Sequence, residues 1–355
     1  MTIYEMPETQ ITADARGNML TFTGTWGTTA NAAYSSGSAQ VSSTVGDKVT
    51  VKWTGRALWL LTEQNATSGT FSLTIDGVAL PGVIIMGGAV QMYKVFQPIF
   101  RAAPGAGNAA HTSILTVVSG SITVDSLIVV SDALLQPTPG VLVCLGDSVA
   151  LGNGSTDPTR FSYAARLAML LSTRSAPGIT LINKGLGSDN LYCKDATHAG
   201  GMYRMITDVI PNAPHFLTVN FGINDIYTNG GQATDFFRQY MALLQFIEDT
   251  MDTTQVIVAV GTPTPATPLF FGVSPSTSGS KDDNYLMAVA ATRIAVQSFG
   301  WCRLADLHAV IETHDSFNIP NFTGVTFDVH PNDAGHGAAA LEFYRAMTAT
   351  DSGMY

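Results

Sequence analysis

Charged side chains are scarce in this sequence. Only 12 % of its 355 residues are Asp, Glu, Lys or Arg, and 17 basic residues face 27 acidic ones, which gives a formal charge of −10. No run of basic residues is available to neutralise a phosphate backbone, so nucleic acid is not expected as a partner. No stretch reaches the ~18 consecutive apolar residues that a membrane-spanning helix needs.

Cysteine is also rare. Cys144, Cys193 and Cys302 lie far apart and form no Cys-x-x-Cys pair, and the seven histidines show no metal-ligand spacing. We therefore expect no disulfide, no metal site and no cofactor, and we expect Cys144 and Cys302 to be buried thiols.

The N-terminal segment shows no recognisable targeting signal. Residues 1–16 are polar and lack the apolar core of a signal peptide, so export through the usual pathway is not indicated. The abundance of Gly, Ser, Thr and Asn is typical of β-rich extracellular or virion proteins. The localisation and the oligomeric state are left open.

The first part of the chain has the pattern of an antiparallel β domain. Up to about Ala133, short apolar runs alternate with turn residues, and Asp76-Gly77 is a hairpin-turn signal. This spacing predicts a jelly-roll-like β-sandwich over residues 1–135, as a carbohydrate-binding or accessory domain. The expected strands are 19–23, 48–53, 58–62, 70–75, 83–86, 92–96, 113–118 and 122–130.

The pattern changes after Gln136-Pro137-Thr138-Pro139-Gly140, which is the candidate domain boundary. Apolar strands then alternate with helical segments, which predicts a three-layer α/β/α domain over residues 136–355 with a five-stranded parallel, flavodoxin-like sheet. The expected strands are 141–145, 179–183, 216–221, 256–260 and 302–307, and the expected helices are 162–171, 202–210, 234–250, 284–299 and 334–347. The long segment 262–281 is expected to be a loop bordering the active face.

A serine follows the first strand of this second domain. Ser148 lies in Cys-Leu-Gly-Asp-Ser-Val, and the carboxyl ends of parallel strands are where open α/β sheets place their chemistry. Ser148 is thus a candidate nucleophile, provided that a base accepts its proton. Taken alone, it could equally be a turn serine that satisfies local backbone groups.

Two further segments end neighbouring strands. Asn224, in Gly222-Ile223-Asn224-Asp225, could donate its amide to an oxyanion, or could simply cap a turn. The turn Asn183-Lys184-Gly185-Leu186-Gly187-Ser188 could complete an oxyanion hole with backbone N–H groups, or could be a flexible connection.

A histidine precedes the last expected helix. His330, in Asp328-Val329-His330-Pro331, could reach a serine at the sheet edge and act as the general base. Asn332 or Asp333 can cap the helix. His336 is expected to be structural and hydrogen-bonded beneath the site.

These four segments, Gly146-Asp147-Ser148, 183–188, 222–225 and 328–331, resemble in order the four blocks of the SGNH (GDSL) hydrolase superfamily, over about residues 141–347. The resemblance implies ester hydrolysis through an acyl-serine, with Ser148 as nucleophile and His330 as base. It also implies an oxyanion hole made of the Ser148 N–H, the Asn224 side chain and an N–H of the second block, from Gly187 or Ser188.

Two positions depart from the family pattern. The family usually has Asp-x-x-His, whereas here Asp328 stands two residues before His330 and Phe327 occupies the usual place. Either Asp328 or a backbone carbonyl could orient the imidazole. Ser188 stands where the family usually has glycine.

A β-sandwich before such a domain resembles family-two carbohydrate esterases and deacetylase domains of phage tails. The expected substrate is therefore an O-acetylated carbohydrate or another small ester. The sandwich aromatics Trp26, Trp53, Trp59 or Tyr93 could supply a sugar-binding wall, although such residues more often form core. The alternatives are a lipase or thioesterase for longer acyl chains, roofed by Leu269, Phe270 and Phe271, and a non-catalytic virion or tail module.

Overall fold

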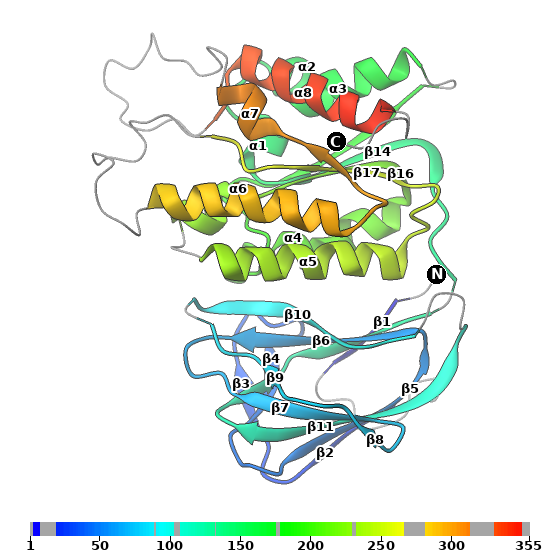
Figure 1. Cartoon of the computed structure of the whole chain (residues 1–355), viewed down its shortest axis with the longest axis vertical. Coiled ribbons are helices and arrows are strands. Elements are labelled where there is room, and N and C mark those ends of the chain that lie inside the picture. The colour runs from blue at the N-terminus through cyan, green and yellow to red at the C-terminus, as the bar shows by residue number, and fades with distance from the viewer. Residues whose placement is uncertain are drawn as a thin grey trace. The chain divides into compact units, whose positions relative to one another are not determined.

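The computed structural model of the protein describes residues 3–7, 19–88, 90–102, 107–131, 133–174, 178–228, 232–265, 281–312 and 330–349. The chain forms two compact units (Figure 1). The first comprises Met1–Leu134 with Tyr192–Tyr203, and the second comprises Leu135–Leu191 with Arg204–Tyr355. The predicted boundary at residue 135 and the accessory role of the first domain stay predictions.

The first unit consists of antiparallel sheets with the strand orders β1-β13-β6-β10, β2-β5-β11-β7-β8 (with β9 beside β7) and β12-β4-β3. Its strands are β1 (Ile3–Pro7), β2 (Met19–Thr23), β3 (Gly27–Ala30), β4 (Ser38–Ser42), β5 (Lys48–Gly55), β6 (Ala57–Gln64), β7 (Thr70–Ile75), β8 (Val78–Ala79), β9 (Ile84–Ile85), β10 (Met92–Arg101), β11 (Ala109–Ser119), β12 (Ile122–Val124) and β13 (Ser126–Val130).

Alternation along these strands builds the core of the sandwich. On β5, Val49, Val51 and Trp53 are buried, and they join Leu58 and Leu60 of β6 in one apolar cluster. Trp59 is also buried. Neither Trp53 nor Trp59 can therefore line an exposed sugar-binding surface, which was one possibility suggested by the sequence. The turn expected at Asp76-Gly77 is confirmed between β7 and β8: both residues have positive φ, 51° and 80°.

The second unit has the predicted three layers. Its parallel sheet has the order β15-β14-β16-β17-β18, with helices α5 and α6 on one face and α3 and α8 on the other (Figure 1). The sheet strands are β14 (Thr138–Gly146), β15 (Thr180–Gly185), β16 (Pro214–Asn220), β17 (Ile257–Gly261) and β18 (Arg303–Ala305). The helices are α1 (Ser148–Leu151), α2 (Pro158–Phe161), α3 (Tyr163–Ser172), α5 (Ala233–Thr250), α6 (Lys281–Ser298), α7 (Leu307–Glu312) and α8 (Asp333–Thr348). The short helix α4 (Gly201–Arg204) begins in the segment that belongs to the first unit and ends at Arg204, with which the second unit resumes.

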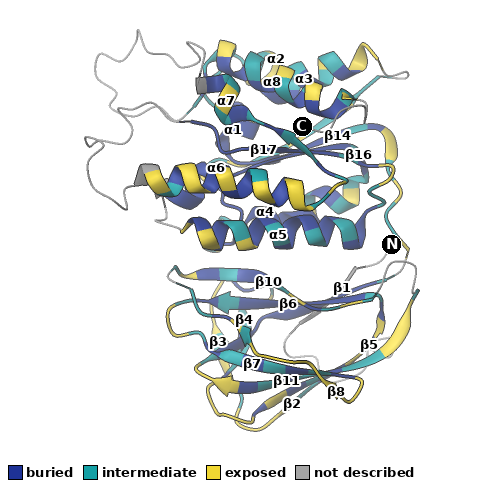
Figure 2. Ribbon diagram, in the orientation of Figure 1, coloured by how far each residue is buried: buried dark blue, intermediate teal, exposed yellow. Residues whose placement is uncertain are grey.

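Burial follows this layering. The central strands β14, β16 and β17 are largely buried, the edge strands β15 and β18 are less so, and α6 carries many exposed residues (Figure 2). The β14 residues Leu142 and Cys144 pack in one cluster with residues of α3 and α8. The predicted fold class is therefore confirmed: an α/β/α domain with a five-stranded parallel sheet, preceded in the sequence by an antiparallel β domain.

Three local predictions need correction. The expected boundary segment 136–140 is partly strand, because β14 already begins at Thr138 and pairs there with Pro214 across a register shift. The single helix expected over 202–210 is divided into α4, a π-helical segment Met205–Val209 and a 3₁₀ turn Ile210–Asn212 that contains Pro211. The expected strand 122–130 is divided at Asp125 into β12 and β13.

All three cysteines are free and buried. Among the described residues, no helix is long and apolar enough to cross a membrane.

Candidate active site

Ser148 lies at the carboxyl end of β14, on the first residue of the short helix α1. The side chain of Asp147 caps this helix by accepting the Val149 N–H at 2.9 Å. Gly146 is required by close packing, since a Cβ there would lie 2.5 Å from the Asn220 carbonyl oxygen. Gly146 and Asp147 thus form the sharp strand-to-helix turn that presents Ser148, whose side chain is only 5 % exposed.

His330 lies beside Ser148, although 182 residues separate them in the sequence. The His330 Nε2 is 2.9 Å from the Ser148 Oγ, within hydrogen-bonding distance. This is the geometry that proton transfer from a hydroxyl to an imidazole requires. Asp328 and Phe327 lie outside the described residues, so the orienting role expected for Asp328 stays a prediction.

The loop after Ser148 holds the segment that carries His330. Thr156 donates its N–H and its hydroxyl to the Asp333 carboxylate, at 2.8 Å and 2.6 Å. His336 Nε2 donates to the Asn153 carbonyl at 2.9 Å, and its Nδ1 accepts the Tyr163 N–H at 3.3 Å. Two loops distant in sequence are thereby joined.

The structural position expected for His336 is confirmed, because the imidazole is fully buried and has protein partners on both ring nitrogens. Burial lowers its pKa, which agrees with a neutral ring that donates from one nitrogen and accepts at the other. Asn332 caps α8 by accepting the N–H groups of Ala334 and Gly335.

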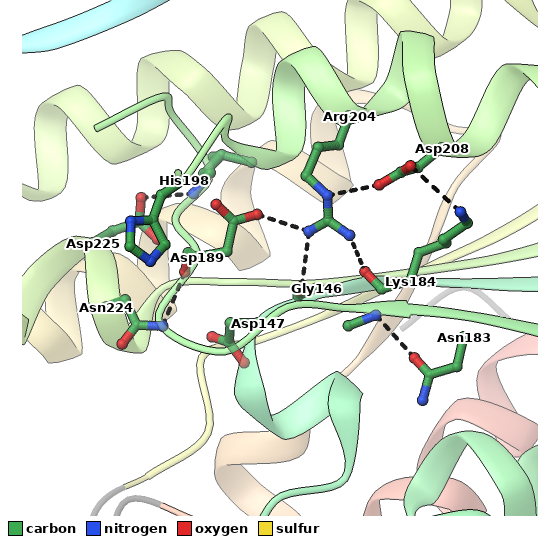
Figure 3. A network of polar contacts seen from close by, with 12 residues as sticks. Gly146, Asp147, Asn183, Lys184, Asp189, His198, Arg204, Asp208, Asn224 and Asp225 are labelled. Atoms are coloured by element: carbon green, nitrogen blue, oxygen red, sulfur yellow. Dashed lines mark hydrogen bonds and ion pairs between the residues drawn. The ribbon is translucent and has the colours of Figure 1, made fainter. Parts of the chain in front are cut away.

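Asn224 begins a π-helical turn, Asn224–Thr228, that follows β16 closely, and its side chain is buried. Its Nδ2 donates to the carbonyl oxygen of Asp189 at 2.9 Å (Figure 3). An amide nitrogen carries two N–H groups, and this bond fixes the plane of the amide. The neighbouring Asp225 accepts the Leu191 N–H at 2.9 Å, so both residues anchor the chain that follows β15.

The turn after β15 contains the other predicted donors, Gly187 and Ser188. Its residues are held by bonds from Leu186 N to the Gly146 carbonyl at 3.1 Å and from Asp189 N to the Leu186 carbonyl at 3.2 Å. Ser188 has φ +61°, in the left-handed region that favours glycine. The departure at Ser188 therefore keeps the backbone conformation that a glycine would adopt, with a steric cost.

Three carboxyl groups are buried behind these donors: Asp147, Asp189 and Asp225. Burial raises the pKa of Asp147 to about 7, and the charge of Asp189 adds to this effect. Burial also raises the pKa of Asp225 well above its usual range. Low dielectric surroundings favour the neutral form of a carboxyl, so Asp147 and Asp225 hold protons more firmly than ordinary carboxyls do.

Arg204 is a residue of this region that carries no sequence motif. Its guanidinium is buried and contacts Asp189, Asp208 and two backbone carbonyls (Figure 3). The burial of this arginine is visible only in the folded chain, and in the sequence Arg204 lies near the start of the segment 202–210 that is expected to be helical. Among the described residues, no group of three or more His, Cys, Asp or Glu side chains could hold a metal ion.

A serine and a histidine in contact at the carboxyl edge of a parallel sheet define the class of serine-dependent hydrolases built on α/β folds. The model of the GDSL-like Lipase/Acylhydrolase family matches residues 144–338. The chain belongs to this family, and it is an ester hydrolase.

Similar solved structures include a family two carbohydrate esterase from Cellvibrio japonicus, with 16 % identity over 97 % of this chain and 96 % of that one (TM-score 0.35). A family two carbohydrate esterase from Clostridium thermocellum, in complex with cellohexaose, has 16 % identity over 90 % and 97 % (TM-score 0.38). A lipase/acylhydrolase from Enterococcus faecalis has 15 % identity over 58 % and 93 % (TM-score 0.45). A comparison with curated protein sequences finds no match.

Proposed function

We propose that this chain is a serine esterase that removes O-acetyl groups from a carbohydrate through an acyl-serine intermediate. The observation that carries the proposal is the 2.9 Å distance between the Ser148 Oγ and the His330 Nε2. Membership of an acylhydrolase family supports the ester as substrate. The resemblance in layout to family-two carbohydrate esterases, noted from the sequence, favours the sugar and the small acyl group.

In the proposed reaction, the Ser148 Oγ attacks the ester carbonyl while His330 Nε2 takes the hydroxyl proton. The negative charge that develops on the carbonyl oxygen is stabilised by the Ser148 N–H, by an N–H of Gly187 or Ser188, and by the Asn224 amide. The bond between the acyl carbon and the sugar oxygen then breaks, and His330 gives its proton to that oxygen, which leaves as the sugar hydroxyl. Water then attacks the acyl-serine with His330 as base, which releases the acid and restores Ser148.

The test is acetate release from 4-nitrophenyl acetate and from an O-acetylated glycan, by the wild-type protein and by Ser148→Ala. We expect the variant to lose at least ~10³-fold in kcat, as happens when a serine nucleophile is removed. Ser172→Ala is the matched control, because this helix serine is exposed and its hydroxyl bonds only backbone groups, donating to the Ala168 carbonyl and accepting the Ile179 N–H. Undiminished turnover by Ser148→Ala would refute the assignment of the nucleophile.

The acyl group is tested separately. Mass spectrometry of rapidly quenched protein should show one acetyl group on the peptide that contains Ser148. Initial rates on acetyl, butanoyl and octanoyl esters should fall with chain length, whereas a preference for octanoyl would replace the acetylesterase with a long-chain acylhydrolase. Failure of Ser148 to react with a fluorophosphonate would instead indicate a non-catalytic module.

A further inference from the structure

The guanidinium of Arg204 contacts three separate segments of the second unit. Its Nη1 lies 2.7 Å from Asp189 Oδ2 and 3.3 Å from the Gly146 carbonyl oxygen, and its Nη2 donates to the Lys184 carbonyl. Nε lies 2.8 Å from Asp208 Oδ2. Figure 3 shows these contacts radiating from one planar group. A guanidinium has five N–H donors in a fixed fork, so it can hold several acceptors in one arrangement.

Three of these four contacts, those with Gly146, Lys184 and Asp189, lead to the proposed oxyanion donors. Gly146 is two residues before Ser148. Lys184 lies in β15, immediately before the turn with Gly187 and Ser188. Asp189 ends that turn, and its carbonyl oxygen accepts the Asn224 amide at 2.9 Å.

The positive charge of Arg204 is paired with the buried carboxylate of Asp189. Its side chain is 7 % exposed and that of Asp189 is fully buried, so the ion pair is shielded from solvent. Burial raises the pKa of Asp147 and of Asp225, and the charge of Asp189 adds to the effect on both, so a further negative charge among these carboxyls is costly. Arg204 compensates the charge of Asp189 and thereby allows the turn to approach Ser148.

We propose that Arg204 is a positioning residue that aligns the three oxyanion donors. This inference rests on the proposed function, because it gives Arg204 a role only if an oxyanion forms beside Ser148. It goes further than that function in naming a residue that touches neither substrate nor nucleophile. A purely structural arginine would stabilise the same sheet edge without affecting the chemical step.

Arg204→Lys keeps the positive charge but cannot reach Asp189 and both carbonyls with one ammonium group. We expect kcat for 4-nitrophenyl acetate, per active site titrated with a fluorophosphonate, to fall about 10–100-fold, because misplaced donors no longer meet the transition state. KM should change less than about threefold, since the donors act mainly in the transition state. Arg303→Lys is the matched control, because Arg303 also bonds two backbone carbonyls, those of Ala346 and Met347.

Hydrolysis of a thionoester separates an effect on the oxyanion donors from a loss of stability. The negative charge of a thionoester develops on sulfur, which is a weak hydrogen-bond acceptor, so it benefits little from the donors. The ester-to-thionoester ratio of kcat should therefore fall about 10-fold in Arg204→Lys and stay unchanged in Arg303→Lys. This ratio is independent of the folded fraction.

A second variant tests the same role in case Arg204→Lys folds poorly. Asp189→Asn keeps an oxygen for Arg204 but removes the ion pair, and it should lower the same ratio. If both variants keep the ester-to-thionoester ratio of the wild type, Arg204 does not position the donors. If the wild-type protein itself shows no turnover that depends on Ser148, the proposed function is wrong instead.

Discussion

Gly154 packs directly against His330. Gly154 has φ +89°, and a Cβ at this position would lie 2.8 Å from the His330 Cβ and 2.3 Å from the Pro331 carbonyl oxygen. The loop that follows Ser148 therefore supports the histidine from behind, and the absence of a side chain at residue 154 allows His330 to approach Ser148.

Replacing this glycine should move the histidine. In Gly154→Ala, the new Cβ displaces the His330 segment, and we expect kcat for ester hydrolysis to fall about 10²-fold, since small displacements of a catalytic group cost that much. Gly178→Ala is the control, because Gly178 has φ +108° but open space around its Cβ position. Both variants carry backbone strain, but only Gly154→Ala should lose activity per folded molecule; equal kcat values would contradict this account.

The imidazole of His330 should be indispensable for turnover. Since general acid–base catalysis contributes about 10²–10⁴-fold, we expect His330→Asn to lose kcat by this factor. His215→Asn serves as the control, because His215 lies in β16 with its ring against Phe216. Initial rates at saturating ester measure the effect, and a loss below threefold would exclude His330 as the base.

The amide of Asn224 should act in the transition state. Asn224→Ala is expected to lower kcat about 10²–10³-fold with little change in KM, as for other oxyanion donors. Asn212→Ala is the matched control, because Asn212 Nδ2 also donates to a backbone carbonyl, that of Asp208 at 2.7 Å. A rise in KM at constant kcat would instead place Asn224 in ground-state binding.

Ser188 should tolerate glycine and reject β-branched residues. Relief of its positive φ offsets the greater entropy of glycine in the unfolded chain, so Ser188→Gly should leave stability unchanged or raise it by about 1 kcal/mol. Ser188→Val should lose about 1–3 kcal/mol and reduce kcat as well. Ala213, with φ +42°, provides the comparison: Ala213→Val should lose stability but keep kcat. Urea unfolding and initial rates test both effects.

The sequence predicts the strands of the parallel sheet well because they are continuous apolar runs. β14, β15, β16 and β17 each overlap their predicted range, with ends displaced by at most three residues. The strands β3 and β4 were missed because Gly27–Ala30 and Ser38–Ser42 contain mostly Gly, Ser, Thr and Ala, which carry no alternating apolar signal. In these strands, pairing within the sheet prevails over a weak local pattern.

Some residues of the candidate site could be predicted from the sequence and others could not. Ser148, Asn224 and the turn with Gly187 and Ser188 could be placed at one sheet edge because each follows a recognisable strand. Arg204 and Gly154 could not be assigned roles, since their partners Asp189 and His330 are distant in sequence or carry no spacing rule. The contacts that position a catalytic group depend on the whole fold, whereas the groups themselves follow the order of the strands.

The buried carboxyl of Asp147 should make stability fall with rising pH. Its folded-state pKa is about 7, against an ordinary value of 3.8. Between these values the unfolded state has lost the proton and the folded state retains it, so unfolding releases a proton and higher pH favours unfolding. This contribution is fully present below about pH 4 and is lost by about pH 7; at 1.36 kcal/mol per unit it is on the order of 4 kcal/mol.

Asp147→Asn keeps an oxygen for the Val149 N–H and removes the titration. The decrease in the free energy of unfolding between pH 4 and pH 7, measured with urea, should therefore be smaller in this variant than in the wild type. Asp252→Asn is the control: hydrogen bonds from Thr254 lower the pKa of Asp252, so it is ionised in both states over most of this range and its removal should change the slope little. Identical slopes in the wild type and Asp147→Asn would show that Asp147 is ionised in the folded protein across this range.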